Sequence, residues 1–433
     1  MPIDNIFHSN DVELLKESGD SSAEIPKSVR DSVHEIIEQV RTEGDKAIFD
    51  LTERYDEVTL DRLRVTEEEI EAVEEKLSEE EKDTIDRSIE RIRKFAEAQK
   101  EALVDDLERE FGEGIKCGQR TLPVEAAGTY VPSGNFTHIA TAAMAIVPAS
   151  VAGVNRIITS TPPEPDGSVN PYQLYTMASA GTDEIYTIGG AQAIAAMAYG
   201  TETIDPVDVV TGPGNVFVVE AKRQVFGQVD LDLLPGPTEV LIIADETADP
   251  YVLAVDLLSQ AEHGEHSRPA LISSDRDTAE ETIEQIDTVL PRLETEETAR
   301  KCWKKNGEVV VVPDDDTAVD VANEYAMEHL QVMTDTPRDL MDDLLNYGSL
   351  FLGENAPVVF GDKITGPNHI LPTHETARFS GGCNVESYLK TVTHQELTPE
   401  GAASLSADGA KISAMEGMEG HRLSAEIRPI EDQ

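Results

Sequence analysis

The chain has 433 residues, enough for two or more domains, and 39% of them are hydrophobic, so it can bury sizeable cores. It carries 85 acidic against 35 basic residues, a formal net charge of −50 at pH 7. A chain this acidic is repelled by nucleic acids and anionic lipids, so neither is an expected partner. No run approaches the roughly 20 apolar residues of a membrane span, and the first residues lack the features of a signal peptide.

The acidic residues are spread along segments that also carry apolar stripes, so they do not form a disordered tail. Self-repulsion at this charge weakens a fold in dilute buffer, whereas molar salt shortens the screening length to about 3 Å. We therefore expect a halophilic protein in a salt-rich cytoplasm. Three cysteines without paired spacing, Cys117, Cys302 and Cys383, favour a reducing compartment and argue against disulfides or a cysteine zinc site.

The first 110 residues are predicted to be helical. Apolar residues recur at helical spacing over 28–55 and again along the highly charged stretch 66–100. The glutamates of this second stretch are interpreted as a solvated helix face rather than as site residues.

From Gly128 onward, strands and helices are predicted to alternate. Alternation of this kind favours parallel sheets covered by helices, here an α/β fold of two Rossmann-like units separated by the Leu234-Pro235-Gly236-Pro237 break. Strands are expected at 156–159, 184–188, 207–210, 240–244, 270–273 and 309–312, and near Leu350 and Val358. Helices are expected at 172–180, 191–199, 216–225, 251–262, 278–290 and 318–329.

The last part of the chain, from Gly381, is polar and rich in glycine, alanine and serine, with a helix predicted over 388–393. It has too few apolar residues to bury a core of its own, so we expect it to pack on a partner subunit. The expected division is an N-terminal arm (1–25), a discontinuous α/β domain (26–128 and 238–380), a second α/β domain (129–237) and a C-terminal tail (381–433).

Two glycine turns, 188–192 and 210–215, are predicted to join a strand directly to a helix. Such turns expose N–H groups at a helix start, where phosphates bind. Neither turn has the GxGxxG spacing of a dinucleotide fingerprint, so glycines that serve only tight turns are an equal alternative. A third loop, 128–135, places an aromatic ring or an amide within reach of a ligand.

Gln260 and His263 are three residues apart on a predicted helix and would share one face, which suits a metal. Glutamine is an uncommon zinc ligand, and His263 with His266 is a more ordinary pair. A capping or core histidine is the alternative interpretation.

Glu328 and His329 are predicted at a helix end, where glutamate could activate water and histidine accept a proton. A histidine favoured by the helix dipole is the competing interpretation. Asp362 and His369 fall on the predicted loop 361–369, a usual setting for site residues. His421, in the polar tail, has no core to fill.

Taken together, these segments resemble the histidinol dehydrogenase family. The resemblance runs in order from about residue 25 to the end, so it is far more specific than any single glycine motif. The matching segments are Gly-Thr-Tyr-Val-Pro-Ser-Gly at 128–134, Gly-Gly-Ala-Gln-Ala-Ile-Ala at 189–195, Gly-Pro-Gly-Asn at 212–215, Leu-Pro-Gly-Pro-Thr-Glu-Val at 234–240, Ser-Gln-Ala-Glu-His-Gly at 259–264, Glu-His-Leu at 328–330, Gly-Pro-Asn-His-Ile-Leu-Pro-Thr at 366–373 and the Glu416 to His421 tail.

The resemblance implies the last two steps of histidine biosynthesis, in which L-histidinol is oxidised through histidinal to L-histidine and two NAD⁺ are consumed. It implies one Zn²⁺ per subunit and a homodimer with shared active sites. The implied acid/base pair is Glu328 and His329, and the implied NAD contacts are Tyr130, Gln192 and Asn215. The implied zinc ligands are Gln260, His263, Asp362 and His421. The implied substrate contacts are these four residues with Thr238, His329, His369 and Glu416.

Two residues depart from the family pattern: Thr238 stands where serine is common, and Ser133 replaces a frequent glycine. The hydroxyl survives at position 238, so a substrate contact there is still expected. Other chemistries stay open, namely a related dehydrogenase acting on another amino alcohol or a sulfonated alcohol, and a zinc hydrolase with Glu262 or Glu328 as base. A non-enzymatic acidic scaffold would require the set of metal-ligating residues to be accidental.

Overall fold

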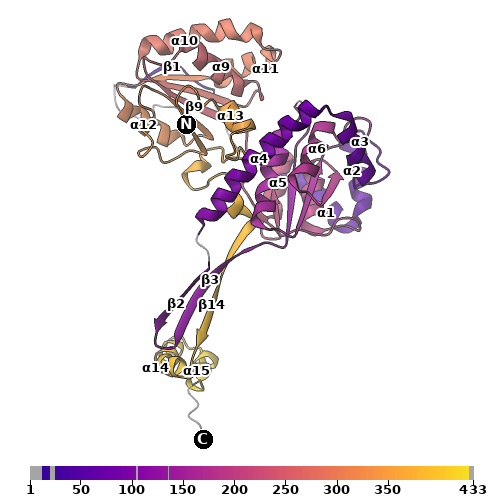
Figure 1. Ribbon diagram of the computed structural model, residues 1–433, viewed down its shortest axis with the longest axis vertical. Helices are drawn as coiled ribbons and strands as arrows, with labels where there is room; N and C mark the ends of the chain where they lie inside the picture. The colour runs from indigo at the N-terminus through magenta and orange to yellow at the C-terminus, as the bar shows by residue number, and fades with distance from the viewer. Residues whose placement is uncertain (1–11, 20–24, 104–105, 135, 429–433) are drawn as a thin grey trace. The chain divides into compact units, whose positions relative to one another are not determined.

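The computed structural model describes residues 12–19, 25–103, 106–134 and 136–428 (Figure 1). Its contacts divide the chain into two compact units, which are described separately. Unit 1 comprises Met1–Ala98 and Glu125–Tyr388, and unit 2 comprises Gln99–Val124 and Leu389–Gln433. Most of the expected N-terminal arm lies outside the described residues. The domain boundaries expected from the sequence stay a prediction.

Unit 1 contains a parallel five-stranded sheet in the order β6-β5-β4-β7-β8. Its helices connect successive strands, as parallel pairing requires. The strands are β4 (Ala126–Tyr130), β5 (Arg156–Thr161), β6 (Glu184–Thr187), β7 (Val209–Thr211) and β8 (Asp230–Leu231). The helices are α5 (Ile139–Ala152), α6 (Pro171–Ala180), α7 (Gly190–Tyr199) and α8 (Val216–Val225).

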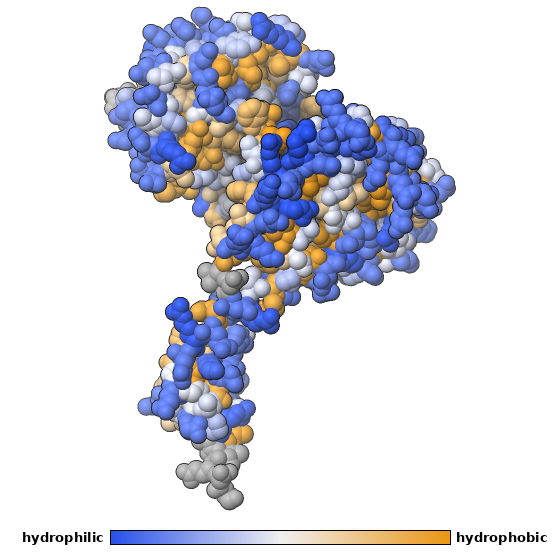
Figure 2. Space-filling model, in the orientation of Figure 1, coloured by the Kyte–Doolittle hydropathy of each residue, from blue (hydrophilic) through white to orange (hydrophobic). Residues whose placement is uncertain are grey.

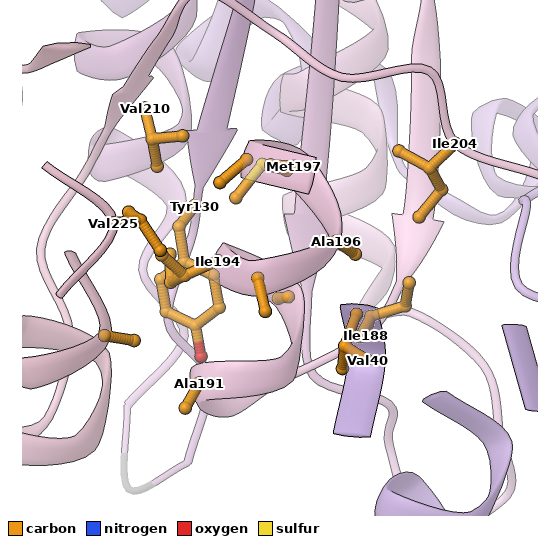
Figure 3. Close-up of a cluster of buried hydrophobic side chains, with 14 of the residues drawn as sticks. Val40, Tyr130, Ile188, Ala191, Ile194, Ala196, Met197, Ile204, Val210 and Val225 are labelled. Atoms are coloured by element: carbon orange, nitrogen blue, oxygen red, sulfur yellow. The ribbon is translucent and has the colours of Figure 1, made fainter. Parts of the chain in front are cut away.

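The N-terminal helices cover this sheet. They are α1 (Lys27–Glu43), α2 (Asp45–Tyr55), α3 (Glu67–Lys76) and α4 (Glu79–Ala102). Helices α1 and α2 pack with α7 and α8 around a cluster that includes Val40, Ile194 and Val225 (Figure 3). Each of the two helical stretches expected from the sequence is broken in two. Gly44, with φ of 58°, separates α1 from α2, and Ser78 starts α4 by accepting the N–H of Glu81.

A second sheet of unit 1 has six strands in the order β1-β11-β10-β9-β12-β13. All neighbours are parallel except β1, which runs antiparallel to β11. The strands are β1 (Glu13–Lys16), β9 (Glu239–Ala244), β10 (Arg268–Ser273), β11 (Glu308–Val311), β12 (His329–Met333) and β13 (Ser349–Leu352). The sequence therefore predicted correctly that two parallel-sheet units flank the Leu234–Pro237 break.

Both faces of the six-stranded sheet are buried. Val240 and Ile242 of β9 point to one face, where α9 (Pro250–Ala261), α10 (Arg276–Val289) and α11 (Glu296–Asn306) pack. Leu241 and Ile243 point to the other, against α12 (Asp315–Tyr325). The continuous apolar sequence of β9 follows from this double coverage. The strand expected near Val358 is wrong, because Val358 begins the short helix α13 (Val358–Lys363).

Unit 2 is an antiparallel three-stranded sheet in the order β14-β3-β2 followed by two helices. Its elements are β2 (Leu107–Gly112), β3 (Ile115–Pro123), β14 (Leu389–Leu397), α14 (Pro399–Met415) and α15 (Glu419–Glu426). The helix predicted over 388–393 is wrong: β-branched residues 391–393 favour the strand that forms there. The expectation that the first 110 residues are helical also fails at β1 and β2.

Few apolar side chains of unit 2 are buried. Ile412, Met415 and Leu423 all keep more than half of their surface exposed. On the face drawn in Figure 2, hydrophobic residues of this unit lie among hydrophilic ones rather than beneath them. Across the described ranges, no helix combines the length and apolarity needed to cross a membrane.

Candidate functional site

The predicted catalytic pair lies at the amino end of β12, and the predicted substrate contact Thr238 lies at the amino end of the neighbouring parallel strand β9. Thr238 immediately precedes β9, and Glu328 immediately precedes β12, whose first residue is His329. The predicted helix 318–329 therefore ends too late. Helix α12 stops at Tyr325, and Ala326 adopts a left-handed conformation with φ of 48° before the chain enters the sheet.

Glu328 is buried and held through one oxygen. Its Oε2 accepts the Glu239 N–H at 2.9 Å and the Thr238 hydroxyl at 2.6 Å. The Thr238 oxygen also lies 3.0 Å from the side-chain oxygen of Gln260. Burial raises the pKa of Glu328 to about 7, although the neighbouring His329 opposes the shift. Both contacts use Oε2, and no hydrogen bond to Oε1 is found among the described residues, so Oε1 is the oxygen left for a water or substrate.

His329 is oriented by the same residue of β9. Its Nδ1 lies 2.9 Å from the Glu239 carbonyl, which can only accept, so Nδ1 carries the proton. Its Nε2 lies 3.3 Å from Asp362 Oδ1, and within the described part of the chain neither atom has a hydrogen-bond partner. Burial alone lowers the pKa of His329, but the carboxylates of Glu328 and Asp362 raise it to about 9.

Asp362 lies on α13, so the loop predicted over 361–369 is wrong at its start. Burial alone raises the pKa of this carboxyl, yet its contact with His329 holds the pKa below its usual range. The orphaned Oδ1 of Asp362 and Nε2 of His329 form the kind of buried polar pair that calls for a bound ion or ligand.

His369 uses both ring nitrogens within unit 1. Nδ1 lies 2.8 Å from the Asp362 carbonyl, and Nε2 lies 2.9 Å from the hydroxyl of Thr141 at the start of α5. Since the carbonyl can only accept, Nδ1 donates and Nε2 accepts. Burial lowers the pKa of His369 to about 4, consistent with a neutral ring. His369 thus links α13 to α5. Its predicted substrate contact stays a prediction.

Gln260 and His263 do not share a helical face as predicted. Gln260 is buried in the last turn of α9, whereas His263 lies in the turn beyond the helix end at Ala261. The ring of His263 lies 6.0 Å from that of Phe136, with a tilt of 51°. Desolvation by surrounding protein atoms lowers the pKa of His263 to about 4, which keeps the imidazole neutral and suited to a metal.

Neither Phe136 nor His138 was predicted as a site residue, yet both lie near His263. His138 lies beside α5, and burial and the proximity of His263 lower its pKa to about 4. The only available signal was their place soon after β4. The loop predicted over 128–135 is wrong at its start, because residues 128–130 belong to β4. Their position in the sequence does not show where the rings of Phe136 and His138 point.

The predicted NAD residues lie at the carboxyl ends of strands of the five-stranded sheet. Tyr130 ends β4, and its buried phenol oxygen accepts the N–H of Gly190 at the start of α7, at 3.0 Å. Gln192 is buried in the first turn of α7. Asn215 caps α8 by accepting the N–H groups of residues 217 and 218. The two strand–turn–helix junctions expected from glycine spacing are confirmed, and the cofactor role stays a prediction.

The structure joins Thr238, Gln260, Glu328, His329 and Asp362 through one series of contacts. Glu416, at the end of α14, and His421, on α15, belong to unit 2 and are exposed there. Among the residues described, no three or more His, Cys, Asp or Glu side chains are grouped so as to hold a metal. This search leaves out amides such as that of Gln260.

Comparison with known proteins decides the family. The model of a family described as histidinol dehydrogenase matches residues 20–429. The chain belongs to the histidinol dehydrogenase family. A solved histidinol dehydrogenase from Elizabethkingia anophelis superposes with a TM-score of 0.89 at 33% identity, covering 94% of this chain and 93% of that one. The family assignment makes the chain an oxidoreductase.

Relatives in this family carry different names. A histidinol dehydrogenase from Methanothermobacter thermautotrophicus is 42% identical over 90% of this chain and 91% of its own length. A sulfopropanediol 3-dehydrogenase from Ruegeria pomeroyi is 40% identical over 96% of both. Because these identities are so close, overall similarity does not select the substrate.

The Thr238 hydroxyl can be tested without any ligand. In Thr238→Val the buried Glu328 carboxyl loses one of its two donors, which we expect to lower the free energy of unfolding by about 1–3 kcal/mol. Thr238→Ser keeps the hydroxyl and serves as the matched control. Denaturant unfolding of both variants measures the difference. Equal stability of the two would show that the hydroxyl does not support Glu328.

Proposed function

We propose that this enzyme oxidises L-histidinol to L-histidine through histidinal, with a zinc ion in the site and two NAD⁺ consumed in succession. The observation that carries the proposal is the state of His329. Its Nδ1 is fixed by the Glu239 carbonyl, while Nε2 is buried, unpartnered and directed at Asp362. An imidazole held in this way is a proton acceptor whose reactive nitrogen is set in advance.

The residues of unit 1 suit a divalent metal. Gln260 and Asp362 offer oxygen atoms, and His263 offers a neutral nitrogen. In the described ranges, Asp362 Oδ1 accepts no hydrogen bond and lies 3.3 Å from His329 Nε2. When bound, the zinc ion would hold the imidazole and amine of histidinol and so fix its alcohol carbon. A metal ion bound to Asp362 would offset the carboxylate charge that stabilises the imidazolium of His329. The pKa of His329 would then fall, and Nε2 could accept a proton.

The nucleotide is assigned to the turns that follow β6 and β7. Tyr130, Gln192 and Asn215 cluster around these turns, where the chain starts α7 and α8. NAD⁺ would supply the hydride acceptor in each of the two oxidations. Helix starts of this kind suit the phosphates of a dinucleotide, although the Tyr130 oxygen already occupies the N–H of Gly190.

His329 and Glu328 then divide the proton transfers. His329 Nε2 takes the hydroxyl proton during the first oxidation. Glu328, with its pKa raised to about 7 by burial, is poised to activate a water through Oε1 for addition to the aldehyde. His329 releases its first proton to solvent and then accepts the hydroxyl proton of the hydrated aldehyde in the second oxidation. Thr238 and Glu239 keep Glu328 in place throughout.

We propose further that the enzyme is a homodimer in which the tail of one copy serves the site of the other through Glu416 and His421. The support is the exposed apolar surface of unit 2, with Ile412, Met415 and Leu423 uncovered. A cytoplasmic, salt-rich setting follows from the net charge of −50 and the sparse cysteines.

A second substrate class has one specific observation in its favour. Lys363, next to Asp362, is exposed, and its charge lowers the pKa of His138, His263 and His369. A cation beside these residues would attract a sulfonated alcohol and repel the ammonium group of histidinol. The name of the Ruegeria pomeroyi relative points the same way.

A substrate comparison tests the proposal. The purified enzyme, with Zn²⁺ and NAD⁺ in high salt, is given L-histidinol or 2,3-dihydroxypropane-1-sulfonate while NADH absorbance is followed. We expect two NADH per histidinol and a higher kcat/KM for histidinol. A preference for the sulfonate, lost in Lys363→Gln, would replace histidinol as the substrate. No NADH with either would reject both.

Glu328→Gln tests the division of roles. The amide cannot activate water, so we expect oxidation of supplied histidinal to fall by about 10²–10⁴-fold, with a smaller loss for the alcohol step. Single-turnover NADH formation from each substrate measures the two steps. Equal losses in both would show that Glu328 has no special part in aldehyde oxidation.

His263→Asn tests the metal. We expect this variant to retain its fold but to bind Zn²⁺ at least about tenfold more weakly, with parallel loss of histidinol binding. Metal content after dialysis and calorimetric titration with Zn²⁺ measure the change, and His266→Asn is the neighbouring control. Full activity of a metal-free His263→Asn protein would contradict the metal assignment.

A further inference from the structure

A fully buried ion pair lies behind the turn that follows β7. Lys222 of α8 and Asp232, just after β8, both have side chains with no exposed surface. Their Nζ and Oδ1 atoms are 2.5 Å apart. No proposed substrate or metal contact involves either residue, so the pair requires a separate explanation.

The pair holds both peptide groups of one residue, Gly212. The Lys222 ammonium donates to the Gly212 carbonyl at 2.9 Å, and Asp232 Oδ2 accepts the Gly212 N–H at 2.8 Å. Asp232 Oδ1 also accepts the N–H of Leu233 at 2.6 Å. A single residue is thus clamped from both sides by charge-assisted hydrogen bonds, which are the stronger kind.

Gly212 needs such support because its conformation is restricted. Its φ is 104°, and a Cβ there would lie 2.1 Å from the carbonyl oxygen of Tyr130. No other residue type fits this approach between β4 and the turn. The preceding Thr211 is fixed as well, through a 3.0 Å hydrogen bond with the buried Tyr388 hydroxyl. Three residues beyond Gly212, Asn215 begins α8.

Stability alone does not account for a pair of this kind. Removing two charges from water costs free energy, and replacing a buried pair with apolar residues is often neutral or stabilising. The geometry of this pair instead serves the backbone of one turn. Its net charge is zero, so it also adds no negative charge behind a turn meant for an anionic ligand.

We propose that Lys222 and Asp232 are positioning residues: they fix the Gly212 turn so that Asn215 and the start of α8 face the dinucleotide. The proposal rests on the proposed use of NAD⁺ at this turn. It assigns to a buried pair outside the site the task of presenting the cofactor-binding backbone in one conformation.

The test uses the double variant Lys222→Met/Asp232→Asn in the full-length protein. Lys222→Met alone leaves an unpaired buried carboxylate and risks unfolding, whereas an amide at position 232 is neutral and can still accept the Gly212 N–H. Glu220→Gln is the matched control. Glu220 is also buried on α8 and paired, with Arg223 at 2.6 Å, but it does not contact the turn.

Three measurements are made on both variants: amide hydrogen exchange over residues 209–217, the Kd for NAD⁺ by calorimetry, and kcat with KM for NAD⁺. For the double variant we expect faster exchange, Kd and KM raised about tenfold or more, and kcat within about threefold of wild type. Glu220→Gln should leave all of these unchanged, even if its unfolding midpoint falls equally.

Unchanged exchange in the double variant would overturn the proposal, and so would faster exchange with unchanged NAD⁺ affinity. Equal changes of exchange and NAD⁺ affinity in Glu220→Gln would mean that the pair has only a general structural role, and this result would also overturn the proposal. A wild-type protein that binds no NAD⁺ would refute the proposed cofactor instead. In that case the exchange data alone decide whether the pair braces the turn.

Discussion

The candidate site depends on one residue of β9 whose two backbone groups hold two neighbouring side chains. The N–H of Glu239 binds Glu328, and its carbonyl binds His329. This requires β12 to pair with β9 in a single register, with His329 opposite Val240. A slip of one residue would reverse every side chain of β12, so the sheet's hydrophobic pattern also fixes the proposed acid/base pair.

The two sheets of unit 1 carry their candidate site residues at opposite ends of their strands. In the five-stranded sheet, the turns proposed to bind NAD⁺ lie after β6 and β7, at the carboxyl ends of parallel strands, where ligands usually bind in such sheets. In the six-stranded sheet, Thr238 and Glu328 lie at the amino ends instead. There the chain supplies no glycine-rich helix start. Instead, the polar side chains of Thr238 and Glu328 lie beside β9. This arrangement suits a metal and a small substrate better than it suits phosphates.

The sequence predicted the regular parts of this fold better than the irregular ones. Parallel strands such as β9 are buried on both faces, so their apolar runs are unambiguous. At Ala326, however, a left-handed residue ends α12 early and turns the Glu328-His329 pair into a strand start. At β14, the β-branched residues 391–393 and pairing with β3 together form a strand where a helix was predicted. The contact of Asp362 with His329 could not be predicted from spacing, because it depends on tertiary packing.

Lys222 and Asp232 could not be found by a motif search either, because their pairing also depends on tertiary packing. Each looks like an ordinary charge in a chain with 85 acidic residues, and only burial distinguishes them. On the surface of such a protein, one more carboxylate changes little, because water and ions screen exposed charges. In the interior, the same carboxylate must be paired, and its partners then determine a backbone conformation. The number of acidic residues therefore does not identify the charges that shape a candidate site, whereas their burial does.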